Sequence, residues 1–520
     1  NSYDESENSK NSQYELSMLF KGLSISGLPI DVKAIKNAGF RNLSGRVSLN
    51  EKGGELTLDA PGSRLDFPGI FAEGRLAFDT LKLEGSWVTA PTLEFKFEDL
   101  IASNTDASVQ LHGGWKNTGD LGTLEVRGDI QYLNARSAYR YVPIVAGGWG
   151  TNNWLKGALQ GGIARNAKVD VYGPLRQFPF KNSENPDYIF RIAGNVEDVT
   201  LDYLPSMKKD AKGQWIPGEW PQIRQIHGTL AFEADSMIVN VNQARTKEGA
   251  LLHEVTAEIP SYGAHGVPLL ITGHAQGALS AMADYVNQSP ISGMIGHALE
   301  NSQSKGNAAL NLELMIPITE AHKTEVKGEV HLENNFVHLD KVPPMDKANG
   351  SVIFSEKGVW APKLTAEVHG KPVAGSINTA EDGKISILAS GVVDAPMVSK
   401  IIDSPASTSL LDFIEGEAYA NVRVDIQKGV SVYVNSALMG AYTNLPAPLN
   451  KQKDDVWPLT FEMTPCTNTK ECSNRMRLSV KDHLLKMDIL YDSTERGLKA
   501  DRGSFAITTP VETIPSQTGL

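Results

Sequence analysis

The chain has 520 residues, of which 41% are hydrophobic and 21% charged. This balance is typical of a folded globular protein and excludes a disordered or fibrous chain. The 49 basic and 61 acidic side chains give a net charge of −12, so the composition lacks the basic excess with which proteins bind nucleic acid. The sequence also has no apolar run of the roughly 18 residues that a membrane-spanning helix requires.

The first residues form a polar stretch, and residues 1–22 are expected to be a poorly ordered leading segment. Beyond it, apolar and polar residues alternate along much of the chain, as in Leu93, Phe95 and Phe97 with charged residues between them. Successive side chains of a strand point to opposite faces, so this pattern predicts strands with one apolar face. Short turn sequences such as Asn50-Glu-Lys-Gly-Gly54 separate the strands. The sequence therefore predicts a mainly β chain built as an antiparallel sheet.

Two stretches interrupt the alternation. Ala278–Leu299 and Ala395–Ile414 have apolar residues at helical spacing, and each contains a Ser-Pro pair that divides it. Each is followed by alternating strands, which suggests a degenerate repeat and an elongated body. The expected organisation is a first β portion over residues 23–277, a helical break with a β repeat over 278–392, and a second such repeat over 393–520.

The predicted helices are too few to cover the apolar face of such a sheet, so the sheet must curl or form a sandwich. A curled sheet whose inner face is incompletely filled is a hydrophobic groove that could bind acyl chains. The best candidates for its lining are apolar residues that alternate with polar ones directly after the two helical breaks. They are Leu310, Leu312, Leu314 and Ile316, then Val422, Val424 and Ile426, and finally Val430, Val432 and Val434. Ordinary core packing is the competing interpretation of these residues.

The motifs associated with catalysis are incomplete. Gly273-His-Ala-Gln-Gly277 resembles the nucleophile elbow of a hydrolase, but Ala275 stands where that mechanism requires a serine. His265 and His274 have no acidic or cysteine partner at the spacing of metal ligands. The sequence therefore predicts no enzyme activity, no metal and no cofactor.

The two cysteines, Cys466 and Cys472, lie in one polar stretch. Their spacing does not match a zinc site, and a disulfide-closed loop suits an oxidising compartment such as the periplasm or the cell exterior. Two free thiols in a loop are the alternative.

Several denser motifs remain, rich in tryptophan, proline and glycine. They are Tyr139-Arg-Tyr-Val-Pro143, Trp154-Leu-Lys-Gly-Ala-Leu-Gln-Gly-Gly162, Gly173-Pro-Leu-Arg-Gln-Phe-Pro-Phe180, Tyr203-Leu-Pro205 and Leu445-Pro-Ala-Pro-Leu-Asn-Lys451. In this order they resemble the YhdP branch of the AsmA-like protein family, over roughly Phe67 to Pro510. Proline and glycine at such positions blunt strand edges and permit tight bends, so these motifs are expected to shape the fold rather than to contact lipid.

The resemblance implies a periplasmic β-groove that carries phospholipid between the inner and outer membranes. It also implies an inner-membrane anchor supplied by a segment missing from this chain, and contacts with both membranes through parts outside it. It brings no catalytic residues and no nucleic-acid partner. The alternative function is a secreted β-rich scaffold or adhesin with a fully packed interior and no lipid transport.

Overall fold

A computed structural model of the chain provides the three-dimensional structure. It describes residues 14–508 except for 29–37, 181–184, 207, 209–217, 219, 262–266, 296, 298, 318–319, 321–322, 340–341, 403–410, 428, 466–473, 482–483 and 495–496. Cys466, Cys472 and His265 therefore lie outside the described residues.

The part of the chain that the structure describes is mainly β, with 65% of its residues in strands, which confirms the predicted fold class. In its described part, 29 strands form one open sheet with antiparallel pairing, accompanied by a few short helices. The chain divides into two units, Asn1–Gly273 with Leu314–Thr324 and His274–Glu313 with Glu325–Leu520.

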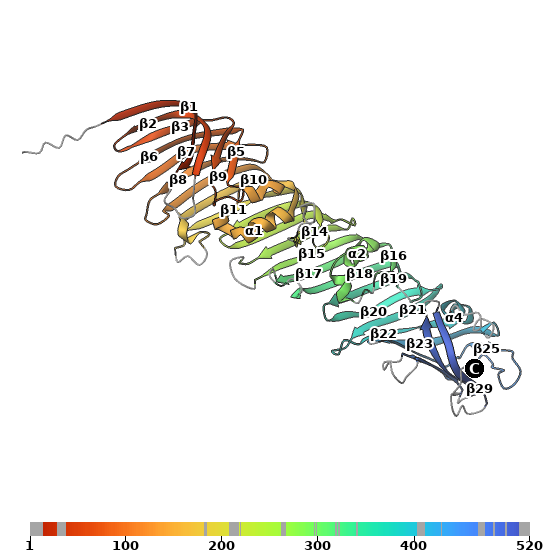
Figure 1. Cartoon of the computed structure of the whole chain (residues 1–520). Coiled ribbons are helices and arrows are strands. Elements are labelled where there is room, and N and C mark those ends of the chain that lie inside the picture. The colour runs from red at the N-terminus through yellow and green to blue at the C-terminus, as the bar shows by residue number, and fades with distance from the viewer. Residues whose placement is uncertain are drawn as a thin grey trace, which may run out of the picture. The chain divides into compact units, whose positions relative to one another are not determined.

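In the first unit the strands from β6 to β14 pair in chain order, so neighbours in the sequence are neighbours in the sheet (Figure 1). Its strands are β1 (Glu15–Leu28), β2 (Ala38–Asn50), β3 (Gly53–Asp59), β4 (Ser63–Asp66), β5 (Arg75–Phe78), β6 (Thr80–Val88), β7 (Glu94–Ser103), β8 (Ala107–Lys116), β9 (Thr123–Asn134), β10 (Leu159–Pro174), β11 (Ile189–Leu201), β12 (Ile223–Glu233), β13 (Ser236–Thr246) and β14 (Leu251–Ile259). Its helices are η1 (Ala135–Arg140), α1 (Ile144–Ala158) and η2 (Leu175–Gln177).

The strands β15 (Pro268–Ala278) and β17 (Asn307–Pro317) pair with each other and contribute residues to both units. The second unit continues with β16 (Gln303–Lys305), β18 (Glu325–His338), β19 (Met345–Ser355), β20 (Gly358–Val368), β21 (Lys371–Thr379), β22 (Ile385–Asp394), β23 (Ile414–Ile426), β24 (Val430–Ser436), β25 (Ala441–Thr443), β26 (Leu459–Thr464), β27 (Asn474–Val480), β28 (Leu485–Thr494) and β29 (Gly497–Ile507). Its helices are α2 (Leu279–Asn287), α3 (Ile291–Met294) and α4 (Ala395–Ile402).

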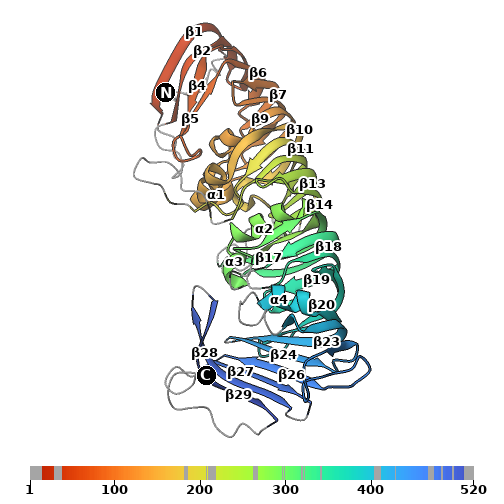
Figure 2. The same ribbon diagram turned by 90° about the vertical axis from the view of Figure 1, so that its right-hand side faces the viewer.

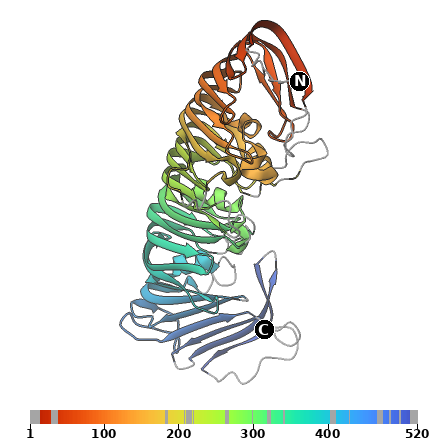
Figure 3. The ribbon, with the colours of Figure 1, turned by 90° about the vertical axis from the view of Figure 1, so that its left-hand side faces the viewer.

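β-Bulges recur along the sheet and shift the register of neighbouring strands. They occur, for example, between Arg165 and Lys168 on β10 and between Val196 and Val199 on β11. Asn166 and Asp198, at these positions, have the positive φ values of 52° and 51° that a bulge accommodates. A bulged strand bends and twists more strongly than a regular one, which accounts for the curved strands in Figures 2 and 3.

The helices lie where the alternation of the sequence breaks. α2 and α3 fall within the predicted stretch 278–299 and are divided near Pro290, and α4 begins the predicted stretch 395–414, of which 403–410 lie outside the described residues. In both Figure 2 and Figure 3, these helices lie on one side of the strands of the second unit. The 15-residue helix α1 was not predicted, because Gly147, Gly148 and Gly150 lower its helix propensity.

The proline and aromatic motifs make contacts within the protein. Phe178 and Phe180 pack edge to face, and Phe178 also meets Phe190 at 4.7 Å between ring centres. The Trp154 indole donates a hydrogen bond to the carbonyl of Tyr203 at 3.2 Å. These contacts match the expectation that the motifs shape the fold.

Candidate functional site

The candidate residues of β23 and β24 form three directly opposed pairs on one face of the sheet. Val422 lies opposite Val434, Val424 opposite Val432, and Ile426 opposite Val430. Opposed residues of antiparallel strands point to the same side, so the six apolar side chains that the sequence singled out share one surface. The surface continues onto β22, where Ile387 lies opposite Val424.

This surface extends across most strands of the second unit. A row of apolar residues runs from β20 to β28, with one residue on each of the strands β20–β24 and β26–β28. Each residue lies directly opposite the next one in the row. Its members are Ala361, Ile377, Ile387, Val424, Val432, Met463, Met476 and Ile489. We refer to these eight residues as the apolar row of the second unit.

The charged residues next to the row members on β26, β27 and β28 lie on the other face. Arg477 of β27 pairs with Glu462 of β26 at 3.3 Å, and Arg475 donates through its Nε to Asp488 of β28 at 2.7 Å. The alternation of each strand thus separates charge from hydrocarbon, because neighbouring residues point to opposite sides. The apolar face is left without charges along the row.

The apolar row is only partly covered by protein. Apart from Ala361, which is buried, every member of the row is half-buried. Large apolar side chains are buried elsewhere in the described residues, among them Phe180, Ile226 and Trp457. The members of the row other than Ala361 do not belong to that buried set, so their apolar surface is only partly covered.

The candidate residues of β17 differ from one another in burial. Leu310, Leu312, Leu314 and Ile316 point to the same side of the strand, since they alternate with Asn311, Glu313 and Met315. Leu310 and Leu312 are half-buried, whereas Leu314 and Ile316 are 7% and 0% exposed. Strands β18–β22 lie between this group and the candidates on β23 and β24 in the order of pairing.

The first unit carries a comparable apolar row that the sequence analysis did not single out. From β1 to β11 it consists of Met18, Val47, Leu56, Gly85, Phe97, Gly113, Val126, Val171 and Phe190. Phe97 lies directly opposite a glycine on each neighbouring strand, Gly85 and Gly113. The alternation in residues 93–97 was the one sequence signal for it, because cross-strand order cannot be deduced from a single strand.

The motif Gly273–Gly277 lies within β15, where Ala275 is buried and has no hydroxyl. His274 contacts the side chain of Asn311 at 2.8 Å, which is a contact between neighbouring strands. Across the described ranges, His, Cys, Asp and Glu side chains form no group of three that could hold a metal ion. In the same part of the chain, no helix is long and apolar enough to cross a membrane.

The fold and these rows define a class of protein: an open antiparallel sheet in which rows of apolar residues lie on one face. The chain matches the protein-family model described as YhdP protein over residues 3–519, and it belongs to this family. It is 23% identical over 433 residues to the intermembrane phospholipid transporter YhdP of Escherichia coli (strain K12). The aligned region covers 79% of this chain and 32% of that relative, so the chain spans about a third of its length. No solved structure is significantly similar to the chain.

Proposed function

We propose that this chain conducts phospholipids between the inner and outer membranes of a Gram-negative envelope. The acyl chains lie along the apolar face of the sheet, and the headgroups stay at its rim in water. The chain works in the periplasm and is held at the inner membrane by a segment outside it. The activity is transport and needs no catalytic residue.

The apolar row of the second unit is the observation that carries this proposal. Its half-buried side chains offer an acyl chain a dry surface, and each buried CH₂ group contributes roughly 0.8 kcal/mol. A charge on this surface would be costly beside hydrocarbon, and the ion pairs Arg477–Glu462 and Arg475–Asp488 lie on the opposite face. The name of the Escherichia coli relative supports phospholipid as the cargo.

The alternative, a β-rich scaffold or adhesin with a filled interior, requires the same residues to be buried against protein. Val424, Val432 and Met463 are half-buried instead. This exposure favours a surface that a ligand completes.

The test is native mass spectrometry and lipid extraction of the purified chain, in wild type and in Val424→Asp. We expect phospholipid to copurify with the wild type and to be lost from the variant, because the new carboxylate would face the acyl chains. Asn421→Asp is the matched control, since Asn421 is exposed on the opposite face of the same strand.

Circular dichroism establishes that each variant keeps its strands. A wild-type chain without phospholipid would overturn the proposal and support the scaffold. Equal phospholipid in Val424→Asp and in Asn421→Asp would remove β23 from the conducting surface.

A further inference from the structure

The two edges at which the strands of the first unit end are built differently. One edge holds short turns, at residues 51–52 between β2 and β3, 89–93 between β6 and β7, and 117–122 between β8 and β9. The other edge holds longer excursions of the chain, namely the β4–β5 hairpin between β3 and β6, and η1 with α1 between β9 and β10. We call the first the turn edge and the second the covered edge.

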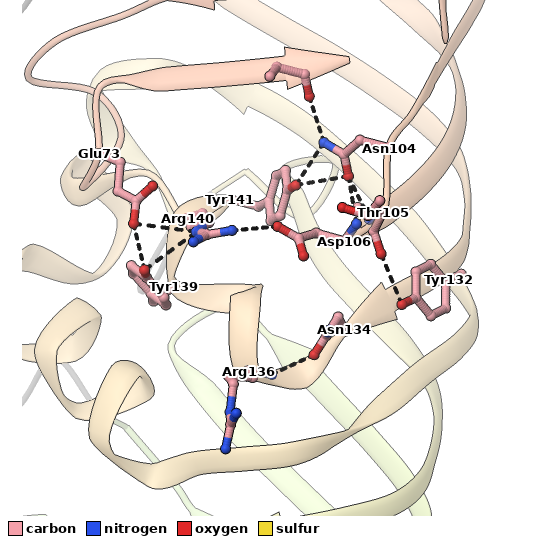
Figure 4. Close-up of polar contacts among 12 residues, drawn as sticks. Glu73, Asn104, Thr105, Asp106, Tyr132, Asn134, Arg136, Tyr139, Arg140 and Tyr141 are labelled. Carbon is pink, nitrogen blue, oxygen red and sulfur yellow. Dashed lines mark hydrogen bonds and ion pairs between the residues drawn. The ribbon is translucent and has the colours of Figure 1, made fainter. Parts of the chain in front are cut away.

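Polar contacts tie the excursions of the covered edge to one another. The Tyr139 hydroxyl of η1 donates to the carboxylate of Glu73, in the loop of the β4–β5 hairpin, at 2.5 Å. Arg140 donates to Asp106 of the β7–β8 turn at 2.6 Å. Figure 4 shows the Arg140 side chain between these two carboxylates. The covered edge is thus occupied by protein, which leaves the turn edge as the place where a lipid headgroup can meet water.

Three aromatic side chains form a row along the turn edge, which we call the aromatic row. Trp87 of β6 lies directly opposite Phe95 of β7, and Phe95 lies directly opposite Trp115 of β8. Side chains two residues apart in a strand point to the same face. Each ring therefore lies on the apolar face, two residues nearer to the turns than a member of the apolar row of the first unit: Gly85, Phe97 or Gly113.

Each ring packs against a glycine, where an added Cβ would meet the ring. The pairs are Gly54 with Trp87, Gly85 with Phe95, and Gly122 with Trp115. The indole of Trp115 also donates a hydrogen bond to the carbonyl of Leu121 at 2.9 Å. All three rings are half-buried, so they are held against the sheet and still present part of their surface to a ligand.

Charged side chains lie beside the aromatic row at the same edge. Glu94 is the first residue of β7, and Lys116 is the last residue of β8. The ammonium groups of Lys96 and Lys116 lie 3.4 and 3.7 Å from the Glu94 carboxylate, and the two lysine side chains are 68% and 52% exposed. Two lysines share one glutamate, so this group is positively charged. Because a lysine has a long and flexible stem, its ammonium group can reach an anion at the end of the strands.

The chemistry changes in a fixed order across the turn edge. Hydrocarbon comes first, then aromatic rings, and then cations in water. A phospholipid has the matching order of acyl chains, ester-linked glycerol and phosphate. Tryptophan favours positions where hydrocarbon meets water, and a charged ammonium group forms strong hydrogen bonds to phosphate. The turn edge therefore complements a phospholipid that lies with its acyl chains on the apolar face.

We propose that the aromatic row, together with Lys96 and Lys116, is a binding site for the glycerol and phosphate of a phospholipid. The rings contact the ester-linked glycerol, and the two ammonium groups pair with the phosphate. Headgroups consequently leave the apolar face of the first unit at the turn edge and not at the covered edge. This inference rests on the proposed function.

The test uses the purified chain and vesicles of phosphatidylethanolamine and phosphatidylglycerol that contain one of two photoreactive phospholipids. One carries a diazirine on its headgroup, and the other carries it at the end of an acyl chain. Adducts are mapped by mass spectrometry. In the wild type we expect headgroup adducts at residues 89–93 and 117–122, few on η1 and α1, and acyl adducts near Val126 and Val424.

Two variants test the two parts of the site, Trp87→Leu for the rings and Lys96→Gln/Lys116→Gln for the cations. We expect several-fold fewer headgroup adducts at the turn edge in each, with unchanged acyl adducts near Val424. Hydrogen exchange of the β7 and β8 amides establishes that each variant keeps its strands. If Trp87→Leu loses this protection, the lysine variant still tests the site, because both of its side chains are exposed.

Each variant has a matched control that should keep the wild-type headgroup adducts. Trp360→Leu repeats the tryptophan change in the second unit, where Trp360 is half-buried and points to the opposite side of β20 from its neighbour Ala361. Lys82→Gln repeats the lysine change at the other end of β6, where Lys82 is exposed.

Headgroup adducts that are as frequent on η1 and α1 as at the turn edge would overturn this site, and so would adducts at the turn edge that neither variant reduces. A loss in the lysine variant alone, with Trp87→Leu folded and unchanged, would overturn the role of the rings. In all of these outcomes the acyl adducts near Val126 and Val424 persist and the proposed function stands. The absence of acyl adducts at both places in the wild type would overturn the proposed function, and the site with it.

Discussion

Leu312 and Ile316 point to the same side of strand β17, yet Leu312 is half-buried and Ile316 is fully buried. The boundary between an open surface and a closed core therefore falls within a single strand. Both residues are apolar and occupy equivalent positions in the alternating pattern. A comparison of substitutions at the two positions therefore reports the effect of burial.

We expect Leu312→Asp to leave the chain folded, because water can reach the new carboxylate. Ile316→Asp should lower the free energy of unfolding by about 3–5 kcal/mol, since a buried and unpaired charge has no compensating partner. Urea unfolding followed by circular dichroism measures both. An equally large loss in Leu312→Asp would place Leu312 in a closed core and remove it from the lipid surface.

The start of helix α4 depends on Asp394. Its carboxylate accepts a hydrogen bond from the Met397 amide at 2.9 Å and pairs with Lys371 at 3.0 Å. Burial raises the pKa of Asp394, but the Met397 amide and Lys371 together outweigh it and lower the pKa below the ordinary 3.8. The ionised group is therefore favoured in the folded state, and its stabilisation is present above pH 3.8 and lost as the pH falls through the lowered value.

We expect Asp394→Ala to cost about 1 kcal/mol at pH 7, the usual value of a helix N-cap. The difference in urea midpoint between wild type and variant should shrink as the pH falls below 3.8. Lys400→Ala, an exposed change in the last turn of the same helix, serves as the control. A difference that does not change with pH would contradict the role of the ionised carboxylate.

Lys451, the last residue of the Leu445–Lys451 motif, is 4% exposed. Its ammonium group donates to the carbonyls of Ala441, Gln452 and Asp455 at 2.9, 3.1 and 2.6 Å. Lys451→Met should destabilise this region by roughly 3 kcal/mol, because three carbonyls lose their donor. Lys453→Met, which changes an exposed neighbour, should have little effect. Hydrogen exchange of the Ala441–Thr443 amides reports the change, and equal exchange in the two variants would contradict it.

The disulfide between Cys466 and Cys472 stays a prediction from the sequence. Mass spectrometry of freshly purified, non-reduced protein should show a mass lower by the two hydrogens of the bond, with no thiol available for alkylation. The loop that it closes is small, so reduction should change the stability only modestly. Two alkylated thiols in that material would rule the bond out.

The sequence by itself determined the fold class. Alternation such as that of Val422, Val424 and Ile426 predicts one apolar and one polar face, because side-chain direction in a strand depends only on local backbone geometry. The breaks at Ala278 and Ala395 were likewise visible as helical spacing. Helix α1 was not predicted, because its three glycines give it a low helix propensity. In the folded chain, contacts with the rest of the protein override this low propensity.

Only the tertiary structure decided which apolar residues are open and which are enclosed. Leu312 and Ile316 have the same alternating pattern around them. Their burial differs because of the segments that pack beside them in the fold, and the sequence near the two residues does not identify those segments. The opposition of Val424 and Val432, and its continuation to Met463 and Ile489, depend on register across several strands. Glu73 lies 3.3 Å from Arg140 although many residues separate the two in the sequence. Alternation is a property of one strand, whereas burial and long-range polar contacts are properties of the strands packed together.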